Sequence, residues 1–219
     1  MQHPRKVAAV LAASAAAVAV AASPALAAPP TVIRVDNAAG AVYSGNIRLV
    51  LTSPVSVTTS LGTASCNRGN IDASVTSSGS NLTVSAYNFY NSPGPACTNS
   101  AGGSSTTTPV GLPWAGGDLN WTGSSGTLRI NNMQVTSTSS TIFGNIVCNY
   151  RGSGAGNSIT MSVTNSTATT QLKATATNIS LTKVDAGSNF LCPSSATYSA
   201  GFDIFGQSGG SYTTKLFLT

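Results

Sequence analysis

Apolar and polar residues alternate along many short stretches of this chain, while the spacing typical of an amphipathic helix does not recur. Alternation is clearest over three stretches and a closing strand: 46–51, 81–86, 158–163 and 213–218. Within the second stretch, a period of two places Leu82, Val84 and Ala86 on the same face. The pattern therefore predicts a chain built from strands.

Clusters of Gly, Ser and Pro separate these stretches, at 77–80, 92–95, 123–126, 152–156 and 208–211. Many short strands between such turns predict an antiparallel β-sandwich or a Greek-key barrel. The Gly-, Ser- and Thr-rich segment 99–108 is the best candidate for a domain boundary, but the composition is the same on both sides of it. We therefore expect this segment to be a long surface loop in a single domain that spans residues 28–219.

The first 27 residues have the features of a secretory signal peptide. Arg5 and Lys6 precede a run of Ala, Val and Leu with one Ser at 7–22, and Pro24 follows this run. The small-x-small pattern Ala25-Leu26-Ala27 predicts cleavage after Ala27. We expect the mature chain, residues 28–219, to be secreted or extracellular, to associate with the cell surface, and to contain no transmembrane segment.

Removal of the signal peptide changes the charge and the chemistry of the chain. Without Arg5 and Lys6, eight basic residues remain against five aspartates, a net charge of about +3. This charge is too small and too scattered for a nucleic-acid partner. The only histidine, His3, is lost and there is no glutamate, which excludes sites of the Ser-His-Asp and Cys-His types.

The four cysteines fit an oxidising compartment, because secreted domains commonly pair their thiols. Four cysteines allow three pairings. The cysteines fall into two separated groups, which favours two disulfides, Cys66–Cys97 and Cys148–Cys192. A zinc site is disfavoured because the mature chain has no CxxC spacing and no histidine. We predict no metal site and no cofactor.

The aromatic residues allow two interpretations. Trp114, Trp121 and the segment Tyr87–Tyr90 could stack on sugar rings, with hydrogen bonds from Asn88, Asn91, Asp118 and Asn120. The alternative is that large rings fill a core that is short of Leu and Ile. Alternation places Tyr87 on one face of its strand, and Asn88 and Tyr90 at opposite parity to it, on the other face.

The five aspartates leave one route to catalysis. Two of them could act as the acid and the base of a glycoside hydrolase. The five aspartates are Asp36, Asp72, Asp118, Asp185 and Asp203. They are isolated in the sequence, and Asp36, Asp118 and Asp185 have Asn or Gly nearby in turn-like settings. We therefore predict that the chain is not an enzyme, with the hydrolase as the alternative.

Four short motifs carry a resemblance to known proteins. They are Gly111-Leu112-Pro113-Trp114, Val147-Cys148-Asn149-Tyr150, Cys192-Pro193 and Ala196-Thr197-Tyr198. This order resembles a family of uncharacterised secreted β-proteins of actinobacteria, over most of residues 31–219. It is more distantly similar to the secreted activators of alkane oxidation in pseudomonads. The second resemblance implies an extracellular, non-catalytic protein that assists contact with hydrocarbon.

These observations lead to one expected function and two alternatives. We expect a secreted, non-catalytic surface or interaction protein that binds a cell-envelope polysaccharide or a hydrophobic ligand. The first alternative is a carbohydrate-active hydrolase that uses paired aspartates. The second is a β-barrel pore, since strands with alternating apolar and polar residues occur both in soluble β-sandwiches and in membrane β-barrels.

Overall fold

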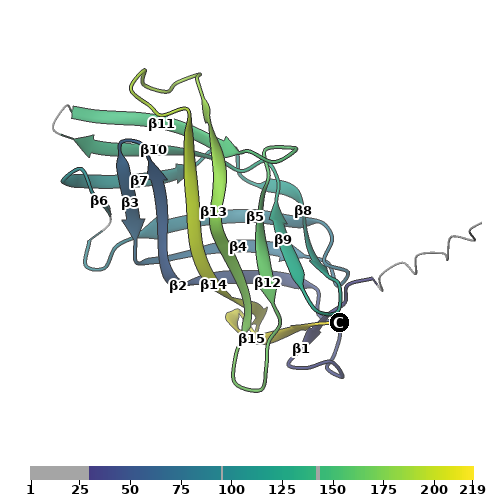
Figure 1. The fold of residues 1–219 in the computed structure, drawn as a ribbon. Helices are drawn as coiled ribbons and strands as arrows, with labels where there is room; N and C mark the ends of the chain where they lie inside the picture. Colours follow the sequence, from purple (N-terminus) through teal and green to yellow (C-terminus); the bar gives the residue numbers. More distant parts are fainter. Residues whose placement is uncertain (1–29, 95, 142–143) are drawn as a thin grey trace, which may run out of the picture.

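The computed structural model describes residues 30–94, 96–141 and 144–219, so the predicted signal peptide lies outside the described residues. The strands are β1 (Ile33–Val35), β2 (Gly45–Thr59), β3 (Gly62–Cys66), β4 (Arg68–Val75), β5 (Leu82–Tyr90), β6 (Cys97–Asn99), β7 (Gly103–Pro109), β8 (Trp114–Trp121), β9 (Gly126–Ile130), β10 (Gln134–Thr141), β11 (Gly144–Gly152), β12 (Ile159–Thr164), β13 (Leu172–Val184), β14 (Ser195–Ser208) and β15 (Ser211–Leu218). They form one antiparallel sheet (Figure 1), which confirms the predicted all-β fold. Across the described residues, we find no helix long and apolar enough to cross a membrane.

Three long strands, β2, β14 and β13, lie side by side and close two rings of hydrogen-bonded strands (Figure 1). The first ring runs β2–β4–β5–β8–β9–β12–β13–β14 and returns to β2. The second ring runs β2–β3–β6–β7–β10–β11–β13–β14 and also returns to β2. Every strand of either ring therefore has a hydrogen-bonded neighbour on both sides.

The rings separate at a proline in β2. This strand pairs with β4 over Gly45–Val50 and with β3 over Val55–Thr59. Pro54 lies at the changeover, where its missing N–H interrupts no ladder. On the other side of β2, the register with β14 shifts between Ser199 and Gly201. Pro54, which has no backbone N–H donor, thus lies where β2 stops pairing with β4 and begins to pair with β3.

The first ring is filled by large apolar side chains, among them the fully buried Trp114 and Phe202. Leu82 and Val84 of β5 are buried, as their alternation predicts, but Ala86 is not. The prediction for Ala86 is wrong because the β4–β5 register shifts, so that Asp72 faces Ala86 while Ala73 faces Val84. This bulge moves Ala86 to the outer face of the sheet.

The segment 99–108 is not the long surface loop that its composition predicts. It contains the last residue of β6, the turn that follows, and most of β7, which runs from Gly103 to Pro109. Its inward-facing Ser105 is almost completely buried and its hydroxyl lies 3.0 Å from that of Ser139 on β10. A strand whose buried positions are Ser and Thr gives no apolar alternation, and its composition therefore resembles that of a loop.

Both predicted disulfides are confirmed, and both belong to the second ring. Cys66–Cys97 joins β3 to β6, and Cys148–Cys192 joins β11 to the loop between β13 and β14. They close stretches of 31 and 44 residues, respectively. In the chain-entropy model each such link stabilises the fold by about 4 kcal/mol. The second ring, which has fewer large buried side chains than the first, thus contains both disulfides.

Candidate functional site

The interior of the second ring is incompletely filled, and a pocket opens at one end of it. Its walls come from β2, β3, β10 and β11, whose inward residues include Val57, Ala64, Ser137, Ser139 and Ile146. Ala64, Ser137 and Ser139 have small side chains and leave part of this interior unfilled. In the first ring, by contrast, large side chains such as those of Trp114 and Phe202 fill the interior. The pocket has a volume of about 60 Å³, where a single water needs roughly 10–15 Å³.

The pocket has one apolar side and one hydroxyl side. Val57, Ala64 and Ile146 belong to the apolar side, together with Tyr150 and Pro193. The hydroxyl side is the inward face of β10, which carries Ser137, Ser139 and Thr141. No charged residue lines the pocket in the part of the chain that the structure describes. The interior therefore suits a neutral group with little polar surface.

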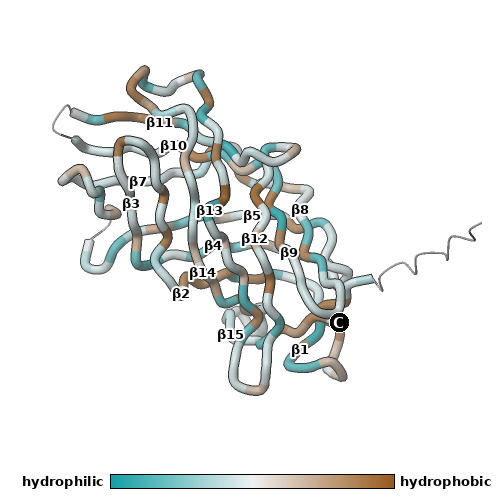
Figure 2. Tube along the Cα trace, viewed as in Figure 1, coloured by the Kyte–Doolittle hydropathy of each residue, from teal (hydrophilic) through white to brown (hydrophobic). Residues whose placement is uncertain are grey.

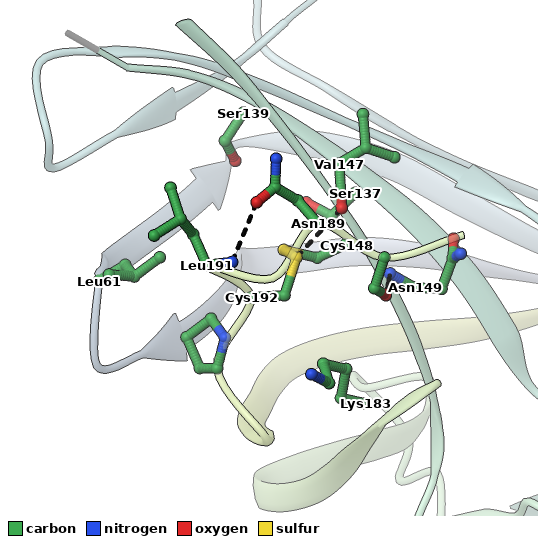
Figure 3. Close-up of a disulfide and its surroundings, with 12 residues drawn as sticks. Leu61, Ser137, Ser139, Val147, Cys148, Asn149, Lys183, Asn189, Leu191 and Cys192 are labelled. Atoms are coloured by element: carbon green, nitrogen blue, oxygen red, sulfur yellow. Dashed lines mark hydrogen bonds between the residues drawn. A yellow bond between two sulfur atoms is a disulfide. The ribbon is translucent and has the colours of Figure 1, made fainter. Parts of the chain in front are cut away.

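One exposed apolar residue lies at the mouth of the pocket, and two more lie in the loop whose Pro193 lines the pocket. Leu61, in the β2–β3 turn, lines the pocket with 51% of its surface exposed. Phe190 and Leu191, in the β13–β14 loop, are 88% and 42% exposed, and apolar colour marks this loop in Figure 2. Figure 3 shows Leu61 and Leu191 with Ser137 and Ser139 around the Cys148–Cys192 disulfide.

The β13–β14 loop is held firmly against β11. The Cys148–Cys192 disulfide anchors it (Figure 3), and the Asn189 amide donates to the Val147 carbonyl at 2.8 Å. The Asn149 amide donates to the Ser188 hydroxyl, also at 2.8 Å. These contacts fix the position from which Phe190 projects.

Tyr150 joins the pocket wall to the end of the same loop. Its hydroxyl donates to the Pro193 carbonyl at 3.1 Å. Burial raises the pKa of this hydroxyl above its ordinary value of 10.0. The group therefore stays protonated at neutral pH and remains a hydrogen-bond donor.

The structure does not bring the sequence-predicted aromatic residues together on one surface. Trp114 and Tyr87 are 1% and 3% exposed, and their rings lie 5.5 Å apart inside the core, so for these two the core interpretation is correct. Asn88 and Tyr90 lie on the outer face of β5, as alternation predicts. Trp121 is half-buried and packs against the core at the end of β8.

Tyr90 and Trp121 are at opposite ends of a strand pair. Leu82 of β5 faces Gly117 of the antiparallel β8, so the path from Tyr90 to Trp121 is roughly 40 Å along the strands at about 3.3 Å per residue. One sugar-stacking platform cannot include both. Tyr90 and Trp121 are close in the sequence but not in space, because β5 and β8 are antiparallel and each residue lies at the end of its strand that points away from the other.

Four of the five aspartates form ion pairs. The pairs are Arg48–Asp72, Arg129–Asp118, Lys173–Asp203 and Lys183–Asp185. Burial raises the pKa of Asp72, but hydrogen bonds from Arg48 and Asn70 outweigh this effect, and the net pKa is below 3.8. A general acid in a hydrolase needs a carboxyl whose pKa is raised. The environment of Asp72 lowers the pKa of its carboxyl instead.

Comparison of the chain with protein-family models, curated proteins and solved structures finds no match. The candidate site is therefore defined by its own geometry. Sequence reasoning missed it, although one signal is present: Phe190-Leu191 is an adjacent pair of large apolar residues between Asn189 and Cys192, outside any alternating stretch. Loops seldom carry such a pair without a role in contact or binding.

Proposed function

We propose that this chain is a secreted, non-catalytic binding protein that takes a hydrophobic ligand into the pocket of the second ring. The observation that carries the proposal is the apolar, uncharged pocket whose mouth is bordered by Leu61 and by the loop with Phe190 and Leu191. An exposed apolar rim beside an apolar pocket is typical of a ligand site.

The size of the pocket supports a narrow ligand. About 60 Å³ accommodates the end of one unbranched alkyl chain and excludes a fused ring system. Burial of a methylene group contributes about 0.8 kcal/mol, so four buried methylenes contribute about 3 kcal/mol. This corresponds to a dissociation constant on the order of millimolar for a short alcohol. The hydroxyls of Ser137 and Ser139 can accept or donate one hydrogen bond to a terminal polar group.

Two further observations support a secreted protein with such a ligand. Both disulfides fit an oxidising compartment. The Leu112-Pro113-Trp114 element is similar to that of the secreted activators of alkane oxidation, and this similarity implies a hydrophobic ligand.

The proposal is tested by titration of the isotope-labelled mature chain with 1-hexanol, followed by amide chemical shifts. We expect saturable shifts at Ala64, Ile146 and Tyr150, with a dissociation constant on the order of millimolar. The control ligand is 1,6-hexanediol, which has the same chain with a second hydroxyl and should bind at least fivefold more weakly. Shifts scattered over the surface, or equal binding of the two alcohols, would contradict the proposal.

A further inference from the structure

A polar groove lies on the outer face of the first ring, over β8, β9 and β12. Its volume is about 540 Å³, within the range of roughly 300–1,000 Å³ that is typical of ligand sites. Asp118, Arg129 and Thr160 face one another across the three strands and form one row of its floor. Asn120 and Thr127 form the next row.

Two segments wall the groove. One is residues 30–31, held by the Thr31 hydroxyl, which accepts from the Trp121 amide at 2.7 Å. The other is the turn at 78–80, whose Gly79 carbonyl accepts from the Leu119 amide at 2.7 Å. Gly79 has a φ of +76°, and a Cβ there would lie 1.9 Å from the Leu119 carbonyl oxygen. This turn therefore requires glycine to lie against β8.

The floor of the groove presents hydrogen-bond donors and acceptors that have no protein partner among the described residues. Arg129 uses its Nε and one terminal nitrogen on a single oxygen of Asp118, Oδ2. Asn120 accepts from Thr31 through its Oδ1. Within the described ranges, this leaves Asp118 Oδ1 as an acceptor, Asn120 Nδ2 as a donor, and the hydroxyls of Thr127 and Thr160 without a protein partner.

The geometry excludes several classes of ligand. Strands β8, β9 and β12 are paired on both sides, so an extended peptide cannot add to them as a further strand. Asp118 and Arg129, the charged residues of the groove, neutralise each other, which disfavours an anion or a polyanion. A single carboxylate is too few ligands for a divalent cation.

A neutral ligand rich in hydroxyls is the class that remains. We infer that this groove binds a linear neutral glycan, whose vicinal hydroxyls exchange hydrogen bonds with Asp118, Asn120, Thr127 and Thr160. This site is independent of the apolar pocket, because it lies on the outer face of the other ring. A chain with both sites links a polysaccharide surface to a hydrophobic ligand.

The test is a titration of the mature chain with cellohexaose, mannohexaose and hexa-N-acetylchitohexaose, followed by amide chemical shifts. We expect at least one hexasaccharide to shift Asp118, Asn120 and Thr160 saturably. Asp118→Asn and Thr160→Ala should each weaken this binding at least fivefold. The matched control is Thr164→Ala, an outward hydroxyl of the same strand outside the groove, which should leave the affinity unchanged. Asp118→Asn removes only an exposed ion pair, so the fold is retained.

Two outcomes would overturn the inference. One is that none of the three hexasaccharides binds, or that binding is unaffected by Asp118→Asn and Thr160→Ala. The other is binding of inorganic sulfate that is lost in Arg129→Gln without any glycan binding, since this would make the groove an anion site. Titration of the same variants with 1-hexanol separates this inference from the proposed function, because neither substitution touches the apolar pocket.

Discussion

Cys192 is covalently bonded to Cys148 in the wall of the apolar pocket, so the loop that carries the exposed rim is fixed to strand β11 (Figure 3). A rim held in this way does not have to become ordered when a ligand arrives. Preorganisation of this kind lowers the entropic cost of binding.

Removal of this link by Cys148→Ser with Cys192→Ser should therefore affect both stability and binding. We expect the free energy of unfolding to fall by about 2–4 kcal/mol and the affinity for 1-hexanol to fall severalfold. Urea denaturation and the chemical-shift titration measure the two effects. The control is Cys66→Ser with Cys97→Ser, since these cysteines do not line that pocket. Equal loss of affinity in both double variants would contradict the role of the fixed loop.

Trp114 is expected to act in the core alone. Its indole is 1% exposed and its Nε1 donates to the Val110 carbonyl at 2.8 Å. Trp114→Ala should lower the free energy of unfolding by about 3–5 kcal/mol. Trp114→Phe retains most of the packing and leaves that carbonyl without its donor, so a loss of about 1–3 kcal/mol is expected. Urea denaturation measures both, and a Trp114→Ala variant as stable as the wild type would refute the assignment.

Phe190 lies three residues before Pro193 of the pocket wall, and we expect it to contribute to ligand binding but not to stability. Because 88% of its surface is exposed, Phe190→Ser should change the free energy of unfolding by no more than about 0.5 kcal/mol. The affinity for 1-hexanol should nevertheless fall. A destabilisation of several kcal/mol, measured by urea denaturation, would show that the loop packs elsewhere.

The stability of the chain should fall at both extremes of pH. Burial raises the pKa of the Tyr87 and Tyr198 hydroxyls above 10.0, so the unfolded chain loses these protons first and stability falls as the pH rises above 10. The pKa of Asp72 is lowered below 3.8, since the hydrogen bonds from Arg48 and Asn70 outweigh the raising effect of burial. The unfolded chain therefore takes up this proton first, and stability falls below about pH 4.

Between the acidic and the alkaline range, the free energy of unfolding should not change with pH. Residues 28–219 contain no histidine and no glutamate, and the cysteines are in disulfides. No side chain therefore has an ordinary pKa between about 5 and 9. Urea midpoints measured from pH 3 to pH 11 provide the test, and Tyr198→Phe should reduce the fall at the alkaline end. A sharp maximum near pH 7 would contradict this account.

The sequence predicts those features that depend on local alternation and on cysteine spacing. Ile159, Met161 and Val163 are buried with exposed residues between them, and both disulfide pairings are as predicted. The prediction for Ala86 is wrong because a bulge depends on the partner strand, which the residues around Ala86 do not specify.

The apolar pocket is harder to predict from the sequence because it depends on small residues. Strand β7 and the pocket wall of β10 place Ser105, Ser137 and Ser139 inward, and inward hydroxyls look like surface residues in a sequence. The closure of the two rings follows from pairings between distant strands such as β2 and β14. Local patterns contain no information on such pairings.

The most direct test of the proposed function is to fill the pocket of the second ring. Ala64 points into the pocket from β3, and the adjacent Ser65 points outward. In titrations with 1-hexanol, Ala64→Phe should lose measurable binding while Ser65→Phe binds like the wild type, with both variants folded by circular dichroism. Binding of 1-hexanol by Ala64→Phe with wild-type affinity would show that the pocket is not the ligand site.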